Sequence, residues 1–158
     1  MLKKSITISP ERERIWQWIH HTIAKPLKAN NGFAICPFIK KYINRIQLVQ
    51  GFDGVETGCA ILNATELEAI VYFDTVGKGI ERRVKRLNTK YRPLNVEVLY
   101  MDPTTSEPPI TTVPDYTWRE HYIIVVQRRD TLHRARTQLR RTKYYDTWDD
   151  FAFLPPNQ

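Results

Sequence analysis

Apolar residues recur every three or four positions in three segments of the chain, which is the spacing of an amphipathic helix. The first segment follows the helix-start sequence Ser9-Pro10-Glu11 and should end near Pro26. The second should be capped by Asp74 or Thr75, and the third by Asp130. The predicted apolar stripes are Trp16, Ile19, Ile23 and Leu27 in the first helix, Val76, Ile80, Val84, Leu87 and Tyr91 in the second, and Leu132, Ala135 and Leu139 in the third.

Shorter runs between these helices are typical of β-strands. They alternate polar and apolar residues or are apolar throughout, and they cover residues 45–50, 69–73, 95–101 and 121–127. Residues 55–67, VETGCAILNATEL, fit either a strand paired back on 45–50 or the start of a short helix, and the strand is favoured. Residues 102–118 contain four prolines and predict a long loop.

The order of these elements predicts a single α+β domain over residues 1–143. The strand, helix and strand within 69–101 imply a parallel pair joined by a right-handed crossover. With 45–50 at one edge, the result is a mixed sheet of about four strands with helices on one face plus an N-terminal helix. This is a ferredoxin-like two-layer sandwich, possibly permuted so that the last strand comes first. The acidic, aromatic residues 144–158 are expected to form a tail.

Composition limits the class of protein. The 158 residues are 42% apolar and 26% charged, which is ordinary globular usage and argues against a disordered or fibrous chain. No apolar run is long enough to span a membrane, and the first residues lack a signal-peptide pattern. Two cysteines are too few for a disulfide scaffold. We therefore expect a reduced, cytoplasmic protein with no membrane partner.

Cys36 is the first candidate for chemistry, because it precedes a proline within FAICPFIKK, residues 33–41. As N-cap of a short helix over 38–41 it would face backbone amides, which lower a thiol pKa and produce a nucleophilic thiolate. The alternative is a small, buried apolar residue. A catalytic thiol would need a base, and the chain offers His20, His21, His121 and His133 without indicating which.

No known hydrolase, nucleotide-binding or metalloprotease motif is present, so we expect no cofactor. A metal site is not expected either. Neither Cys36 nor Cys59 belongs to a CxxC pair, and His20 and His21 are adjacent rather than spaced three or four residues apart.

The segment from Trp18 to Val49 resembles the opening of a small bacterial family of uncharacterised proteins, a domain of unknown function whose hallmark is Cys-Pro-Phe-Ala-Lys. Cys36, Pro37, Phe38 and Lys40 match that motif, and Ile39 replaces the alanine. Residues 66–87 and 122–139 resemble the family's later segments more loosely. The family's histidine-bearing strand is matched here only by YIIVVQRR, which has no histidine. The resemblance implies a site at Cys36 but no activity.

The second candidate feature is basic. The net charge is +7, and residues 78–92 and 128–143 together hold 14 of the chain's 24 lysines and arginines. In a two-layer sandwich both helices would lie on the same side of the sheet and merge their charges into one surface. The glycines around Lys78 could also hold a phosphate at a helix start. The predicted anion-binding residues are Lys78, Arg82, Arg83, Arg86, Arg134, Arg136, Arg140 and Arg141.

These features predict a small basic protein that binds a polyanion, with nucleic acid as the leading partner. The alternative is a thiol-dependent enzyme or redox protein that uses Cys36 on a small molecule, so whether the protein is an enzyme stays open. Self-association through the tail at 144–158 is a further predicted partnership.

Overall fold

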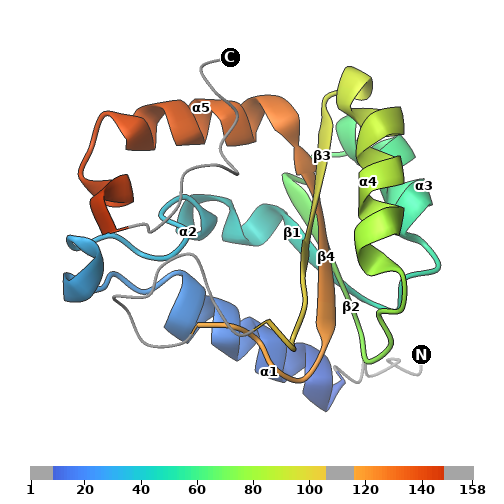
Figure 1. Ribbon diagram of the computed structural model, residues 1–158, viewed down its shortest axis with the longest axis horizontal. Helices are drawn as coiled ribbons and strands as arrows, with labels where there is room; N and C mark the ends of the chain where they lie inside the picture. The colour runs from blue at the N-terminus through green and yellow to red at the C-terminus, as the bar shows by residue number, and fades with distance from the viewer. Residues whose placement is uncertain (1–8, 106–115, 148–158) are drawn as a thin grey trace, which may run out of the picture.

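The computed structural model describes residues 9–105 and 116–147 and contains a four-stranded sheet (Figure 1). Its strands are β1 (Ile46–Gln50), β2 (Ala69–Asp74), β3 (Val96–Met101) and β4 (Tyr122–Arg128), in the order β1-β2-β4-β3. β1 is parallel to β2, whereas β4 is antiparallel to both of its neighbours. The predicted α+β fold with a mixed sheet of four strands is confirmed.

β2, α4 (Ile80–Tyr91) and β3 form the predicted unit of strand, helix and strand, but another strand separates β2 from β3 in the sheet. β4 lies between β2 and β3 and pairs with both, so the predicted parallel pair consists of strands that are not neighbours. The central position of β4 buries apolar residues on both of its faces, with Ile124 and Val126 in the core on one side of the sheet and Ile123 in the core on the other. β2 and β3 are both antiparallel to β4 and therefore run parallel to each other, as predicted, and a strand inserted between them is the split arrangement of the ferredoxin-like plan.

The first predicted helix is present as α1 (Pro10–Trp18), continued by one π-helical segment, Ile19–Ile23. The Oγ of Ser9 accepts a hydrogen bond from the amide of Arg12 at 3.2 Å, as expected for an N-cap. Ile15, Ile19 and Ile23 are buried, so the predicted stripe faces the protein interior.

Residues 55–67 form a helix rather than the favoured strand. α3 (Val55–Ile61) is followed by a 3₁₀ segment, Leu62–Ala64. Val55, Cys59 and Leu62 are buried together against α4 and the sheet, and their spacing is helical. The pattern over GCAIL was too short to separate the two alternatives by periodicity alone.

Two expected caps are wrong. α4 begins at Ile80 after Gly79, whose φ of 74° is the left-handed conformation that glycine adopts without strain, so neither Asp74 nor Thr75 caps it. Val76 precedes the helix and is 68% exposed, outside the buried stripe. α5 (Arg129–Arg140) has Arg128 rather than Asp130 at its N-cap position. The remaining short helices are α2 (Ile39–Tyr42) and the 3₁₀ segments Lys28–Asn30, Ile43–Arg45, Arg92–Leu94 and Tyr144–Thr147.

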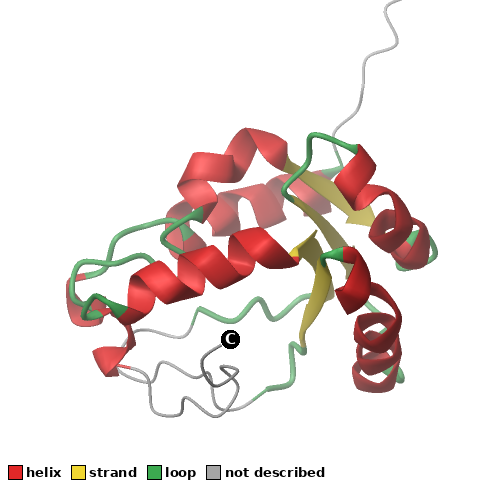
Figure 2. Ribbon diagram, turned by 90° about the horizontal axis from the view of Figure 1, so that it is seen from above, coloured by secondary structure: helices red, strands yellow, loops and turns green. Residues whose placement is uncertain are grey.

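Helices cover both faces of the sheet, which Figure 2 shows from above. Ile70 and Tyr72 of β2 pack toward α3 and α4, whereas Val71 and Phe73 point to the opposite side, where α1 packs. α5 lies on this second side. The expectation that the helices lie on one face is therefore corrected. The physical reason is that five of the six β2 residues are buried, so both faces of the strand need cover.

Residues 144–158, the expected tail, begin inside the packed structure. Tyr144 and Tyr145 are buried against Leu139, Phe33 and Phe38. The rest of the tail, 148–158, lies outside the described residues, as does the centre of the proline-rich loop, 106–115. Among the helices of the described part of the chain, none has the length and apolar character needed to cross a membrane.

Gly58 is required where α3 approaches β2. A Cβ added there would lie 2.1 Å from the hydroxyl of buried Tyr72, which donates a hydrogen bond to the carbonyl of Gly54. Gly58→Ala should therefore lower the free energy of unfolding by about 1–3 kcal/mol, measured by chemical denaturation. Gly54→Ala is the matched control, since its Cβ would meet Tyr72 only at 3.9 Å. Equal stability of the two variants would contradict this packing.

Candidate functional site

A cavity of about 360 Å³ lies on the α5 side of the sheet. Its floor is formed by apolar sheet residues that include Val71, Ile123 and Val125. α5 leaves one end of the sheet and runs away from it, while α1 lies near the other end of the strands (Figure 1). The segment carrying Cys36 and the turn with Tyr144 close the space between the two helices. Volumes of this order are typical of small-molecule sites.

The predicted apolar stripe of α5 explains the roof of the cavity. Leu132, Ala135 and Leu139 share one face of the helix and line the cavity, and Ala135, between the two leucines, has a small side chain. The helix starts directly after β4, so its first turn is held at the sheet while its later turns stand away from it. The sheet face below is therefore incompletely covered, and Leu99 of β3 is 37% exposed.

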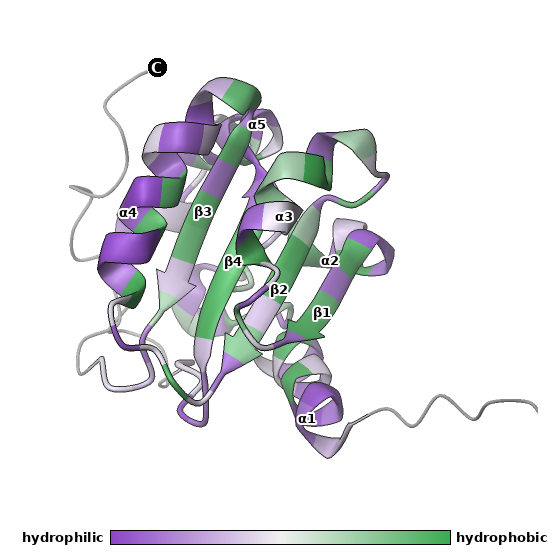
Figure 3. Cartoon of the chain, turned by 90° about the vertical axis from the view of Figure 1, so that its right-hand side faces the viewer, coloured by the Kyte–Doolittle hydropathy of each residue, from purple (hydrophilic) through white to green (hydrophobic). Residues whose placement is uncertain are grey.

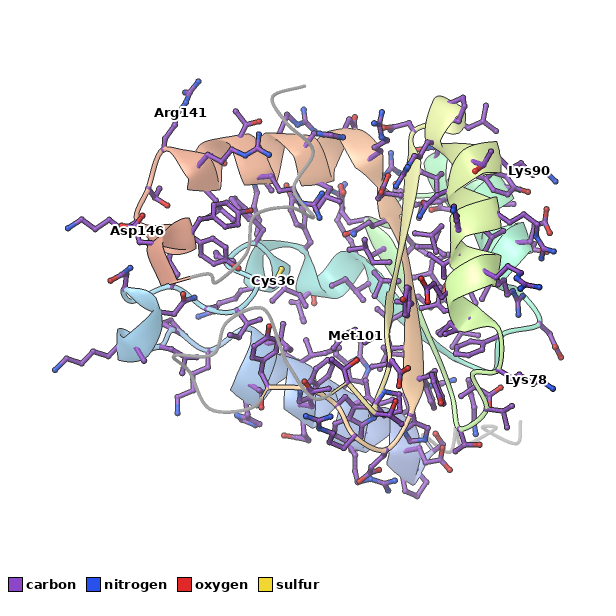
Figure 4. The ribbon with its side chains drawn as sticks, viewed as in Figure 1. Cys36, Lys78, Lys90, Met101, Arg141 and Asp146 are labelled. Atoms are coloured by element: carbon purple, nitrogen blue, oxygen red, sulfur yellow. The ribbon has the colours of Figure 1, made fainter. Side chains whose placement is uncertain are left out.

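Cys36 lines this cavity, and Figure 4 shows it in the space below α5. α2 begins at Ile39 with Phe38 as its N-cap, so Cys36 stands just outside the helix, a correction to its predicted N-cap position. Burial raises the pKa of the Cys36 thiol, and hydrogen bonds from the Phe38 and Ile39 backbone amides oppose that rise only in part. At neutral pH this favours the protonated thiol.

None of the four histidines lines the cavity with Cys36. His20 and His21 are exposed on the first helical segment. His121 is 4% exposed, and its Nε2 lies 3.0 Å from Glu11 while its Nδ1 accepts a hydrogen bond from the Trp118 indole at 3.0 Å. The contact with Glu11 joins α1 to the residue directly before β4. The described residues therefore bring no thiol and histidine together.

Aromatic residues form the end of the cavity near Cys36. Tyr116, Tyr144 and Tyr145 all line it, and the Tyr144 hydroxyl donates a hydrogen bond to the Ile35 carbonyl. Burial raises the pKa of Tyr144 far above its usual value, so its hydroxyl stays neutral and holds the Cys36 segment in place. The sequence predicts Tyr144 and Tyr145 only as part of a self-associating tail and indicates no role for Tyr116, because only the fold brings the three residues together.

The cavity contains few charged groups. Glu68 at one end is held by Arg45 at 3.2 Å and by the Thr131 hydroxyl at 3.2 Å. The Arg128 guanidinium donates to the Thr65 and Leu67 carbonyls at 2.6 and 2.9 Å. Arg136 differs, because among the described residues no hydrogen bond or ion pair joins its side chain to a partner. Burial lowers the pKa of its guanidinium, a direction that reflects an unfavourable apolar setting.

The predicted anion-binding residues do not form one surface. Lys78, Arg82 and Arg86 are exposed along α4 and its approach, where Figure 3 shows a hydrophilic outer side. Arg83 is partly buried and donates to the Phe52 carbonyl at 2.6 Å, so it supports the fold. Arg134 and Arg140 of α5 and its C-cap residue Arg141 are exposed on the other side of the sheet, and Arg136 lines the cavity. Figure 4 shows Lys78 and Arg141 at opposite ends of the molecule.

Cys36 should react slowly with iodoacetamide at neutral pH, because its pKa is raised by burial and only the thiolate attacks. The rate should rise with pH to a midpoint above about 8.5, the value of an ordinary thiol. Cys59→Ala would isolate the signal, although Cys59 is itself buried and has a pKa raised to about 11. A midpoint at or below neutral pH would instead indicate an activated thiolate.

Searches against protein-family models, curated proteins and solved structures find no match to this chain. The resemblance to the Cys-Pro-Phe-Ala-Lys family therefore stays a prediction. Within residues 9–105 and 116–147, no group of three or more histidine, cysteine or acidic side chains is arranged to hold a metal ion. The cavity and the exposed cations of α4 are the features on which a function can be argued.

Proposed function

We propose that this protein binds a small, largely apolar organic molecule in the cavity between α5 and the sheet. The observation that carries the proposal is the cavity itself, about 360 Å³ lined mainly by apolar and aromatic side chains. Protein interiors are usually close-packed, so an apolar space of this size costs packing contacts that a ligand would restore. A few polar groups at its ends would orient that ligand.

The proposal extends the sequence-based alternative of a small molecule held near Cys36 but does not require a reactive thiol. A neutral Cys36 would contribute apolar contact area, as free cysteine commonly does. The Tyr144 hydrogen bond to Ile35 would keep the wall that carries Cys36 in its observed position. The cavity is then a binding site with a preformed wall.

Titration of the full chain with decanol tests the proposal. Trp18 lines the cavity, and its indole donates a hydrogen bond to the Tyr116 carbonyl at 2.9 Å, so its fluorescence should change on binding. We expect saturable binding with a change in emission that Trp18→Phe removes. Calorimetry on the Trp18→Phe variant should still detect the ligand. The absence of saturable binding for decanol, for decanoate and for aromatic probes of similar size would overturn the proposal.

A second candidate function is polyanion binding, with nucleic acid as the leading partner, through α4. Four exposed cations, Lys78, Arg82, Lys85 and Arg86, follow one another along this helix and its approach. Among the described residues none of the four has an ion-pair partner, whereas Lys90 is paired with Glu56 at 2.7 Å. Unpaired like charges at this density favour an anionic partner. The α5 cations would not contribute to the same contact.

A further inference from the structure

Arg136 is placed differently from the other arginines of α5. Arg134, two residues earlier on the same helix, is exposed, whereas Arg136 is partly buried and lines the cavity. Glu97 acts electrostatically on Arg136, but its carboxylate already accepts three hydrogen bonds from Arg92, at 3.3, 3.0 and 2.8 Å, and lies 3.6 Å from Arg129. Within residues 9–105 and 116–147, no acceptor engages the Arg136 donors, which can therefore bind a ligand anion.

A guanidinium beside an apolar space is costly unless an anion meets it. Tyr144 and Tyr145 lie close enough to Arg136 to interact with it electrostatically, but both tyrosines have raised pKa values and stay neutral. Of the two arginines that line the cavity, Arg128 donates to backbone carbonyls, whereas no described carboxylate or carbonyl accepts a hydrogen bond from Arg136. Its planar fork of donors fits both oxygens of a carboxylate.

The acidic residue of the cavity lies away from Arg136. Glu68 contacts Thr131 at the first turn of α5, whereas Arg136 is five residues further along the helix. Because each helical residue advances about 1.5 Å, roughly 7.5 Å of helix separates the two positions. Glu68 also carries a compensating partner in Arg45. A ligand anion at Arg136 would therefore not face an uncompensated negative charge.

We infer that the ligand of this cavity is an amphipathic carboxylate, a single apolar chain ending in a carboxyl group. The carboxylate pairs with the Arg136 guanidinium, and the chain lies along Leu132, Ala135 and the sheet floor toward Cys36. This inference rests on the proposed function and adds the chemical class of the ligand. It concerns binding only, and no bond is formed or broken.

Calorimetric titration with decanoate and decanol, two ligands that share a chain and differ in charge, tests the inference. Arg136→Gln should weaken decanoate binding by about tenfold or more, since a charge-assisted hydrogen-bond pair is lost. The same variant should leave decanol binding unchanged. Arg134→Gln is the matched control and should change neither ligand. Arg136→Lys, which keeps the charge but loses the planar fork, should bind decanoate with intermediate affinity.

A second measurement follows the position of the chain. Saturating decanoate should slow the alkylation of Cys36 in the full-length wild-type protein, because the bound chain would cover the thiol. Equal effects of Arg136→Gln and Arg134→Gln on decanoate, or decanol binding as tightly as decanoate, would overturn the inference while leaving the proposed function intact. If neither ligand binds the wild-type protein, both fail.

Discussion

Replacing Ala135 by phenylalanine should abolish ligand binding without unfolding the protein. Ala135 lines the cavity on the inward face of α5, between Leu132 and Leu139, and a phenyl ring there would occupy space that the proposal gives to the ligand. Excluding only two methylene groups from the cavity costs about 1.6 kcal/mol, which already weakens binding more than tenfold. We expect no saturable heat with decanoate in the variant.

Thr137→Phe is the control for this substitution. Thr137 lies two residues along the same helix and is exposed, so a phenylalanine there adds the same ring without entering the cavity. Circular dichroism and thermal unfolding should show that both variants are folded, and the Ala135 variant should be at least as stable as the wild type because the ring fills an apolar space. Undiminished binding in Ala135→Phe would place the ligand elsewhere.

Reversing the four exposed cations of α4 should remove most nucleic-acid binding, if that second function holds. Lys78, Arg82, Lys85 and Arg86 would each be replaced by glutamate. Each phosphate contact contributes about −0.9 to the slope of log affinity against log salt, so losing four contacts should reduce the slope by about 3.6. We expect affinity for a duplex at low salt to fall by about a hundredfold or more. Fluorescence anisotropy across a salt series gives both values.

The matched control reverses four cations at the end of α5, namely Arg134, Arg140, Arg141 and Lys143. Both variants change the net charge equally, so a difference between them reports position rather than total charge. We expect the α5 variant to retain the wild-type salt slope. An equal loss in both would show that only net charge matters, and a loss confined to the α5 variant would move the interface to that helix. Wild-type protein that binds no nucleic acid at low salt would exclude this function.

The elements with clear periodicity could be predicted from the sequence. Ser9 and Pro10 start α1, the alternation over 45–50 is β1, and Ile80, Val84, Leu87 and Tyr91 are the buried side of α4. Local capping and burial determine these elements, and both are visible in a short window of residues. The same logic failed over 55–67, where a short apolar run is compatible with either period.

The side of the sheet on which each helix packs could not be predicted. The side on which each helix packs determines whether the cations of α4 and α5 form one surface. It depends on which face of β2 each connection reaches. One signal was present: AIVYF is apolar at every position, which indicates a strand buried on both faces. Used fully, it would have predicted helices on both sides of the sheet.

The candidate site was predicted only in part. The Cys-Pro turn marked one wall of the cavity, but Tyr116 and Tyr144 lie 80 and 108 residues further along the chain and reach Cys36 only through the tertiary fold. Arg136 was grouped with the surface cations because charge density alone does not reveal which side chain points inward. Leu132 and Leu139 lie four residues before and three residues after Arg136, a spacing that places Arg136 beside the apolar face of α5. This spacing is the sequence feature that indicates a partly buried side chain.

The most direct test of the account is a crystal structure of the full chain with a terminally brominated fatty acid, whose bromine position is located by anomalous scattering. The account predicts a bromine peak inside the cavity, between α5 and the sheet, with the carboxylate at Arg136. A peak outside this cavity, or an empty cavity at saturating ligand, would contradict it.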